Sequence, residues 1–353
     1  MEKKIGIYTF TAANNYGAVL QAFALKQHLC NAGFDAHCVD YRPLFLTERF
    51  KPFPPFTLQD YANPLKLIKM CLKWNKIRKK NALFEQFKEN ALSFIPVGST
   101  DVDTYIVGSD QVWNYKITCG DRIFLGNIPH SNGHIISYAA SMEQDLDEKW
   151  KMDFKEQLKN FSCISVREEN LQHKLKNDYG INSTLVVDPT LLLSRSQWSM
   201  MGVPYKKATG RFIFMYGFGF SQQEQKNAEL YAKEHKLKLI IASSGVLLRK
   251  GYSNNISPQQ FVWLIEHAEC IITNSFHGTV FSLIFGKRFA ISKKNGLKKN
   301  NRVANLLQLY GMDYVECDID KMLKDDIFLA PAHLPNSICE AINRSKQFLV
   351  NTL

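Results

Sequence analysis

The stretch "IITNSFHGTVFSLIFGKRF", residues 271–289, contains the repeating unit that decides the fold. Its first apolar residues predict a buried strand, the next residues predict a helix, and a second strand begins at Arg288. Strands separated by helices imply a parallel sheet with right-handed crossovers. Asn274, Ser275 and His277 fall where the strand ends and the helix begins. Helix starts at this edge of a parallel sheet offer N–H groups and partial positive charge, which suit an anion.

The same alternation of strands and helices runs through most of the chain. It predicts an α/β fold class with two Rossmann-like domains and an anion site between them, and a helical insertion in the first domain. We expect the first domain over residues 1–200, with the insertion at about 51–99, and the second over 210–325. The polar stretch 202–210 is the expected linker, and a last helix at 335–353 is expected to pack back on the first domain.

Two helix boundaries are indicated by single residues. Gly33 is expected to end the first long helix, because glycine readily adopts the left-handed conformation found there. Ser257 precedes Pro258 and is the expected N-cap of a helix in the second domain.

Composition limits the classes of partner without choosing one. The formal net charge is +11, which favours phosphorylated metabolites, nucleic acid or an acidic membrane face. The eight cysteines contain no C-x-x-C pair, and no metal-ligand cluster occurs, so we expect no metal and no cofactor. No recognition module accompanies the basic residues, which argues against nucleic-acid binding. The sequence has no signal-like start and no run of about 18 apolar residues, so we expect a cytoplasmic protein.

The predicted insertion carries a basic amphipathic stretch at residues 66–80. One interpretation is peripheral contact with an anionic membrane, at the inner face of the cell membrane. The alternative is a solvated basic face over an ordinary core stripe. The basic residues concerned are Lys66, Lys69, Lys73, Lys76, Arg78, Lys79 and Lys80.

Two loops of the first domain follow predicted strands and carry polar and aromatic side chains that suit a sugar. The alternative for each loop is a capped helix start, with an Asn cap in the first and Asp110 in the second. The candidate acceptor-binding residues are Asn14, Asn15, Tyr16, Ser109, Asp110, Gln111 and Trp113.

Basic side chains near predicted strand ends are candidates for binding an anionic donor. Arg167 directly follows a strand and could bind a carboxylate or phosphate, or could form a salt bridge with Glu168 or Glu169. Arg302 and Lys298 lie downstream of His277, in a loop that could instead be simply solvated. Asp188 precedes a proline and is more typical of a turn.

Several segments together resemble the polysaccharide pyruvyl transferase family, in order and spacing from near residue 5 to near 310. They are "TFTAANNYGAVLQAFAL", "YIVGSDQVWN", "ISYAASM", "ISVREENL", "VVDPTLLL" and "ITNSFHGTVFSLIFGKRF".

This resemblance implies a transferase of capsule or exopolysaccharide synthesis with a GT-B-like fold, in which two Rossmann-like domains face a cleft. Its donor would be phosphoenolpyruvate and its acceptor a sugar, with the question of a lipid-linked acceptor left open. The family's histidine falls on His277. Relatives carry an arginine two residues earlier, where this chain has Ser275. We therefore expect Ser275 and Asn274 with Arg302, Arg167 or Lys298 at the donor site.

Two other functions are compatible with the same pattern. A GT-B glycosyltransferase would bind the diphosphate of a nucleotide sugar at the same kind of helix start. A non-catalytic relative would bind a glycan, and the missing arginine at Ser275 is the observation in its favour.

Overall fold

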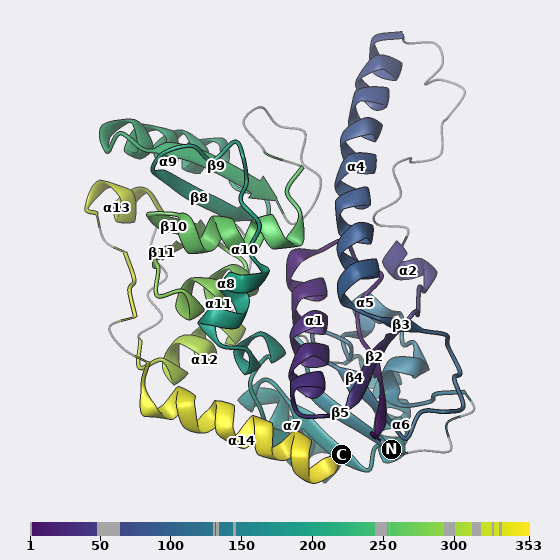
Figure 1. Cartoon of the computed structure of the whole chain (residues 1–353). Helices are drawn as coiled ribbons and strands as arrows, with labels where there is room; N and C mark the ends of the chain where they lie inside the picture. Colours follow the sequence, from purple (N-terminus) through teal and green to yellow (C-terminus); the bar gives the residue numbers. More distant parts are fainter. Residues whose placement is uncertain are drawn as a thin grey trace. The chain divides into compact units, whose positions relative to one another are not determined.

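The strands of the chain form two separate parallel sheets, one in each of two α/β units (Figure 1). The computed structural model describes residues 2–47, 64–129, 131, 134–143, 146–243, 253, 255–292, 301–312, 319–326, 328–331 and 334–353. The first unit comprises residues 1–49, 88–193 and 336–353, and the second comprises 50–87 and 194–335.

The first unit is built on a seven-stranded sheet of order β3-β2-β1-β4-β5-β6-β7. Every neighbouring pair is parallel. All five residues of β4 are buried, as expected for a strand covered on both faces. The strands are β1 Lys4–Tyr8, β2 Asp35–Val39, β3 Phe94–Ile95, β4 Thr104–Gly108, β5 His134–Ala140, β6 Cys163–Val166 and β7 Thr184–Leu185.

Helices and short 3₁₀ turns connect these strands. Gly33, just after α1, has a left-handed φ of +89°, which confirms the predicted helix end. The helices are α1 Tyr16–Asn31, α2 Leu44–Thr47, α5 Tyr115–Thr118, α6 Glu148–Gln157, α7 Glu169–Tyr179 and α14 Asn336–Thr352. The 3₁₀ turns are η2 Arg122–Leu125, η3 Leu158–Asn160 and η4 Pro189–Leu192.

The C-terminal helix α14 packs within the first unit. The Ser345 hydroxyl accepts a hydrogen bond from Val187 N at 2.9 Å, and the ring of Phe348 lies 6.4 Å from that of Tyr138 in β5. These contacts tie the end of the chain to residues that lie 158 and 210 positions earlier.

The second unit contains a four-stranded parallel sheet of order β11-β10-β8-β9. Ser257 is the N-cap of helix α10 as predicted, because its hydroxyl accepts from Gln260 N and the Gln260 side chain accepts from Ser257 N. The strands are β8 Phe212–Gly217, β9 Lys238–Ser243, β10 Cys270–Thr273 and β11 Arg288–Ile291. The helices are α8 Arg195–Met201, α9 Gln222–Glu234, α10 Pro258–His267, α11 Phe276–Ile284, α12 Asn301–Leu309 and α13 Ile319–Lys324.

The division between the units differs from the expected one in two respects. It falls between Leu193 and Ser194, so that residues 202–210 lie inside the second unit and are not a linker. Most of the expected insertion forms one long helix, α4 (Pro64–Ala91), and residues 50–87 group with the second unit. The physical reason is packing, because Lys80 of α4 contacts Ser243 of β9.

Candidate functional site

The turn from β10 to α11 lies at the carboxyl edge of the second sheet, where the sequence predicts an anion site. Ser275 is the N-cap, with its hydroxyl 3.4 Å from Gly278 N. Asn274 bonds the backbone of Phe218, accepting from its N–H at 2.8 Å and donating to its carbonyl at 2.7 Å. The Asn274 amide therefore braces the loop after β8, whereas Ser275 shapes the helix start.

His277 and Arg302 both border the ring of Phe276, the first residue of α11. His277 is the second helical residue and is 7% exposed, with its ring centroid 5.1 Å from that of Phe276. The Arg302 guanidinium, at the start of α12, lies 5.7 Å from the same ring. Two of the predicted donor-site side chains are thus brought to one helix start. Lys298 lies outside the described residues.

Two glycines allow the backbone around this turn to pack closely. A Cβ at Gly278 would lie 2.2 Å from Thr273 Oγ1, and a Cβ at Gly217 would lie 2.0 Å from Asn274 Oδ1. These approaches are far shorter than any real Cβ contact, so the glycines hold α11 and the loop after β8 directly against the strand ends. The helix N–H groups are consequently set in a rigid frame.

In the first unit, the loop after β1 contains Asn14 and Asn15, which have different tasks. Asn15 is the N-cap of α1, with its side-chain oxygen 2.9 Å from Gly17 N, as the capping alternative predicts. Asn14 is 5% exposed, and its Oδ1 accepts from Lys88 Nζ at 2.7 Å. Tyr16 is 1% exposed within α1. The Asn14 side chain thus has a polar partner on α4.

The loop after β4 contains the other predicted sugar-binding residues. Ser109 is fully buried, and Asp110 has a left-handed φ of +65°. The Gln111 side chain donates to Glu143 Oε2 at 2.9 Å. Trp113 is fully buried, with its indole N–H donating to Phe124 O at 2.9 Å. The expectation that Trp113 contacts a sugar is therefore corrected, because its ring belongs to the core.

Arg167 lies in a buried ion-pair network of the first unit. Its guanidinium contacts Asp188 Oδ2 at 2.6 Å and Glu168 Oε1 at 3.1 Å, and Ser141 also donates to that Glu168 oxygen. Burial alone would lower the pKa of Arg167, but the carboxylates of Glu168, Asp188 and Asp110 outweigh it and raise that pKa. This arrangement matches the salt-bridge alternative for Arg167, in which the guanidinium contacts carboxylates of the protein and not a bound phosphate.

Two lysines of α4 are buried, which the sequence analysis did not predict. Lys88 is 1% exposed and contacts Asn14 in the first unit, while Lys80 is 2% exposed and contacts Ser243 O at 3.2 Å in the second. The available signal was their position among apolar residues of a helix. In contrast to Lys80, its neighbours Arg78 and Lys79 in the basic stretch are exposed.

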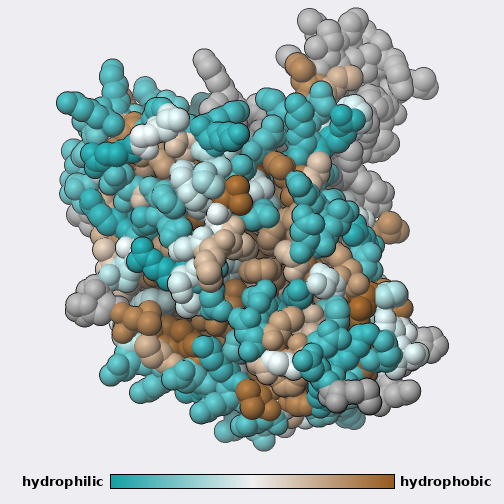
Figure 2. All heavy atoms as spheres, viewed as in Figure 1, coloured by the Kyte–Doolittle hydropathy of each residue, from teal (hydrophilic) through white to brown (hydrophobic). Residues whose placement is uncertain are grey.

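The membrane interpretation of residues 66–80 stays a prediction. The side chains of Lys66, Lys69 and Lys73 lie outside the described residues. Within the described part of the chain, no helix is both long and apolar enough to cross a bilayer. Most residues on the visible face are hydrophilic, with smaller groups of hydrophobic ones between them (Figure 2).

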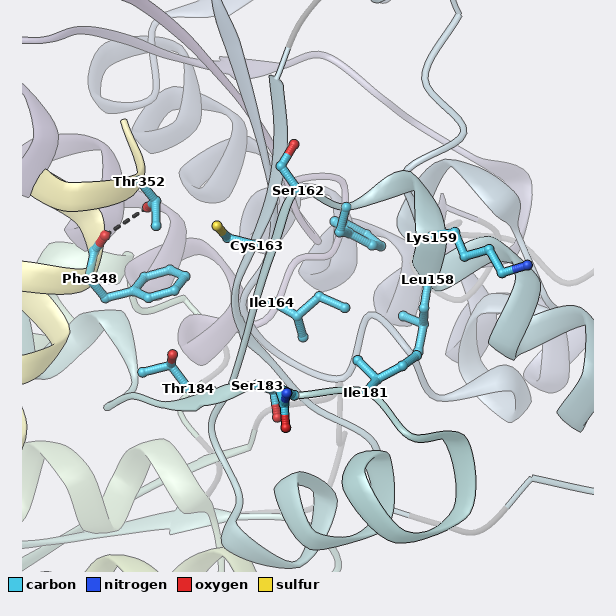
Figure 3. Close-up of a pocket in the computed structure, with 12 residues that line it drawn as sticks. Leu158, Lys159, Ser162, Cys163, Ile164, Ile181, Ser183, Thr184, Phe348 and Thr352 are labelled. Atoms are coloured by element: carbon cyan, nitrogen blue, oxygen red, sulfur yellow. Dashed lines mark hydrogen bonds between the residues drawn. The ribbon is translucent and has the colours of Figure 1, made fainter.

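A hollow of about 490 Å³ lies elsewhere in the first unit, at the amino ends of β6 and β7. Cys163 and Ile164 of β6 line it together with Phe348 and Thr352 of α14 (Figure 3). The predicted site residues lie at the opposite, carboxyl ends of the strands, so this hollow has no part in the site. No group of three potential metal ligands occurs among the residues that the structure describes.

Two solved structures have a fold similar to that of this chain. UDP-GlcNAc 2-epimerase from Methanocaldococcus jannaschii matches with a TM-score of 0.53 and 11% identity, covering 99% of this chain and 100% of that one. A structure of MnaA with UDP from S. aureus matches with a TM-score of 0.50 and 10% identity, covering 100% and 98%. At these identities the likeness shows the fold alone, that of a GT-B-like α/β protein with parallel sheets.

The family follows from the sequence itself. The model of the polysaccharide pyruvyl transferase family matches residues 15–291. The chain therefore belongs to the polysaccharide pyruvyl transferase family, a family of transferases, as the resemblance indicated. Comparison with curated proteins returns no match.

Proposed function

We propose that this protein transfers the enolpyruvyl group of phosphoenolpyruvate to a sugar of a polysaccharide precursor, forming a pyruvate ketal and releasing phosphate. One observation carries the proposal beyond family membership. The helix start after β10 combines a Ser275 cap with His277 and Arg302, both close to the ring of Phe276. A helix start with a neighbouring guanidinium suits a phosphate or carboxylate, and the imidazole can move a proton.

The reaction requires one acid and one base. C3 of the donor gains a proton and becomes a methyl group, while C2 becomes cationic. The two hydroxyl oxygens of one sugar each form a bond to C2, and the bond from C2 to the phosphate oxygen breaks. One hydroxyl proton balances the proton added at C3, and the other leaves with the hydrogen phosphate. Cations near the departing phosphate lower the barrier, because negative charge collects there.

The residues divide between these tasks. His277 is the proposed proton donor to C3 or the phosphate contact, and Ser275 with Arg302 holds an anionic group of the donor. Asn274 supports the turn through its bonds to Phe218. Asn14, with Asp110 and Gln111, is the proposed contact for the sugar.

The test is a reaction of the purified protein with phosphoenolpyruvate and a panel of free and lipid-linked saccharides. Phosphate release and the mass of the product are followed together. We expect phosphate only with a suitable acceptor, and a product heavier by one ketal-linked pyruvate. Stabilisation by a nucleotide sugar, with none by phosphoenolpyruvate, would overturn the proposal in favour of a glycosyltransferase.

A matched pair of histidine variants tests the role of His277. His277→Ala should lower the rate of phosphate release by about 10²- to 10⁴-fold, because a positioned proton donor contributes that much. His267→Ala removes a histidine that is 46% exposed in the same unit and should leave the rate unchanged. Near-normal turnover by a folded His277→Ala protein would remove this residue from the mechanism.

A further inference from the structure

Lys80 is buried inside the protein, where lysine side chains are seldom found. Its side chain is 2% exposed, and Nζ donates to Ser243 O at 3.2 Å. Nζ also lies 5.7 Å from the centre of the Phe84 ring, one turn further along α4. Burial lowers its pKa to about 8, so that the ammonium form still dominates at neutral pH. A desolvated ammonium binds an anion more strongly than one in water, because its charge is less screened.

The position of Lys80 within the second unit follows from the strand register. Ser243, its partner, ends β9 and pairs with Gly217 at the end of β8. On the other side of β8, Tyr216 pairs with Thr273, the last residue of β10. Adjacent strands lie about 4.8 Å apart, so Ser243 stands about 10 Å along this edge from the start of α11. Lys80 thus reaches the same edge of the same sheet as Ser275 and His277.

We propose that Lys80 is a donor-binding residue, its ammonium contacting one anionic group of phosphoenolpyruvate while the α11 start and Arg302 contact the other. The inference rests on the proposed function and deepens it. Lys80 also supplies a cation to a donor site that has Ser275 where the family resemblance implies an arginine, two residues before His277. The donor carries a phosphate and a carboxylate at its two ends, so cations at two points along one sheet edge match its charge.

A stability measurement separates this role from a purely structural one. Lys80→Met has similar length and no charge. Replacing a lysine that serves folding alone would leave the response to the ligand intact, whereas replacing a donor-binding lysine removes stabilisation by the ligand. We therefore expect the rise in melting temperature on adding phosphoenolpyruvate to be lost in folded Lys80→Met.

The experiment compares Lys80→Met with Lys79→Met, which removes the exposed neighbouring charge from the same helix. The KM for phosphoenolpyruvate should rise about 10- to 100-fold in Lys80→Met, as for the loss of a charge-assisted hydrogen bond, and stay unchanged in Lys79→Met. Should Lys80→Met fail to fold, Lys80→Arg keeps the charge but changes its geometry, and its KM should also rise. An unchanged KM in folded Lys80→Met, or in Lys80→Arg as the substitute, would overturn the inference.

The two proposals fail in different ways. A wild-type protein that neither binds nor consumes phosphoenolpyruvate refutes the proposed function. A wild-type protein that does both, alongside a Lys80→Met variant with the same KM, refutes the role of Lys80 alone.

Discussion

The ion pair between Arg167 and Asp188 allows a quantitative prediction about stability. The side chains are 4% and 1% exposed, and Asp188 also accepts hydrogen bonds from Thr190 N at 3.0 Å and from the Thr190 hydroxyl at 2.6 Å. Asp188→Ala removes these three contacts and leaves a buried guanidinium that keeps Glu168 Oε1 at 3.1 Å. Breaking a buried pair in this way costs about 3–5 kcal/mol.

The control is an ion pair of similar length in the same unit that lies in solvent. Arg122 contacts Asp153 at 2.9 Å, with side chains 59% and 25% exposed. Asp153→Ala should cost less than about 1 kcal/mol, because exposed pairs contribute little.

The assay is urea unfolding followed by circular dichroism, with melting temperatures measured in parallel. For a domain of 150–250 residues, about 4 kcal/mol corresponds to a decrease of roughly 8–16 °C in the melting temperature. A loss of stability in Asp188→Ala no larger than in Asp153→Ala would refute the idea that burial makes this pair strong.

Three further predictions concern other parts of the chain. Gly278→Ala should destabilise the second unit by about 1–3 kcal/mol in urea unfolding, because its Cβ would lie 2.2 Å from Thr273 Oγ1; unchanged stability would contradict the rigid frame around α11. Burial, and then the charge of Lys346, lowers the pKa of His28 to about 4 from 6.5. The folded state therefore binds fewer protons than the unfolded state, so stability is complete above pH 6.5 and falls as the pH drops toward 4. The loss should be about 1 kcal/mol at pH 5 after allowing for partial exposure, and it should be absent in His28→Gln in a pH series of unfolding curves. Ser257→Ala removes the N-cap of α10 and should cost about 1 kcal/mol by thermal denaturation, whereas Ser253→Ala should cost much less.

Local patterns predicted much of the fold. The alternation of apolar runs with helical stretches gave the parallel strands, and single residues such as Gly33 and Ser257 marked real helix boundaries. These features depend on neighbours within a few residues, which a sequence displays directly. The turn carrying Ser275 and His277 was predictable for the same reason.

Contacts between distant residues were beyond this reasoning. Arg167 and Asp188 are 21 residues apart. The sequence therefore does not reveal whether the Arg167 guanidinium pairs with a carboxylate of the protein or binds an anionic ligand. Trp113 was expected to contact a sugar, yet its ring packs against Phe154 and Phe161, which lie far along the chain. The burial of Lys80 was not predictable from its neighbours, because its contact with Ser243 spans 163 residues.

The contact between Lys88 and Asn14 fixes which hydrogen bonds the asparagine can make. An ammonium group only donates, so the oxygen of the Asn14 amide must face Lys88, and the nitrogen must face the other way. A molecule that met that nitrogen would have to present an oxygen lone pair and not a hydroxyl hydrogen. Lys88 therefore orients the Asn14 amide so that its nitrogen would donate to the oxygen of any sugar hydroxyl placed against it.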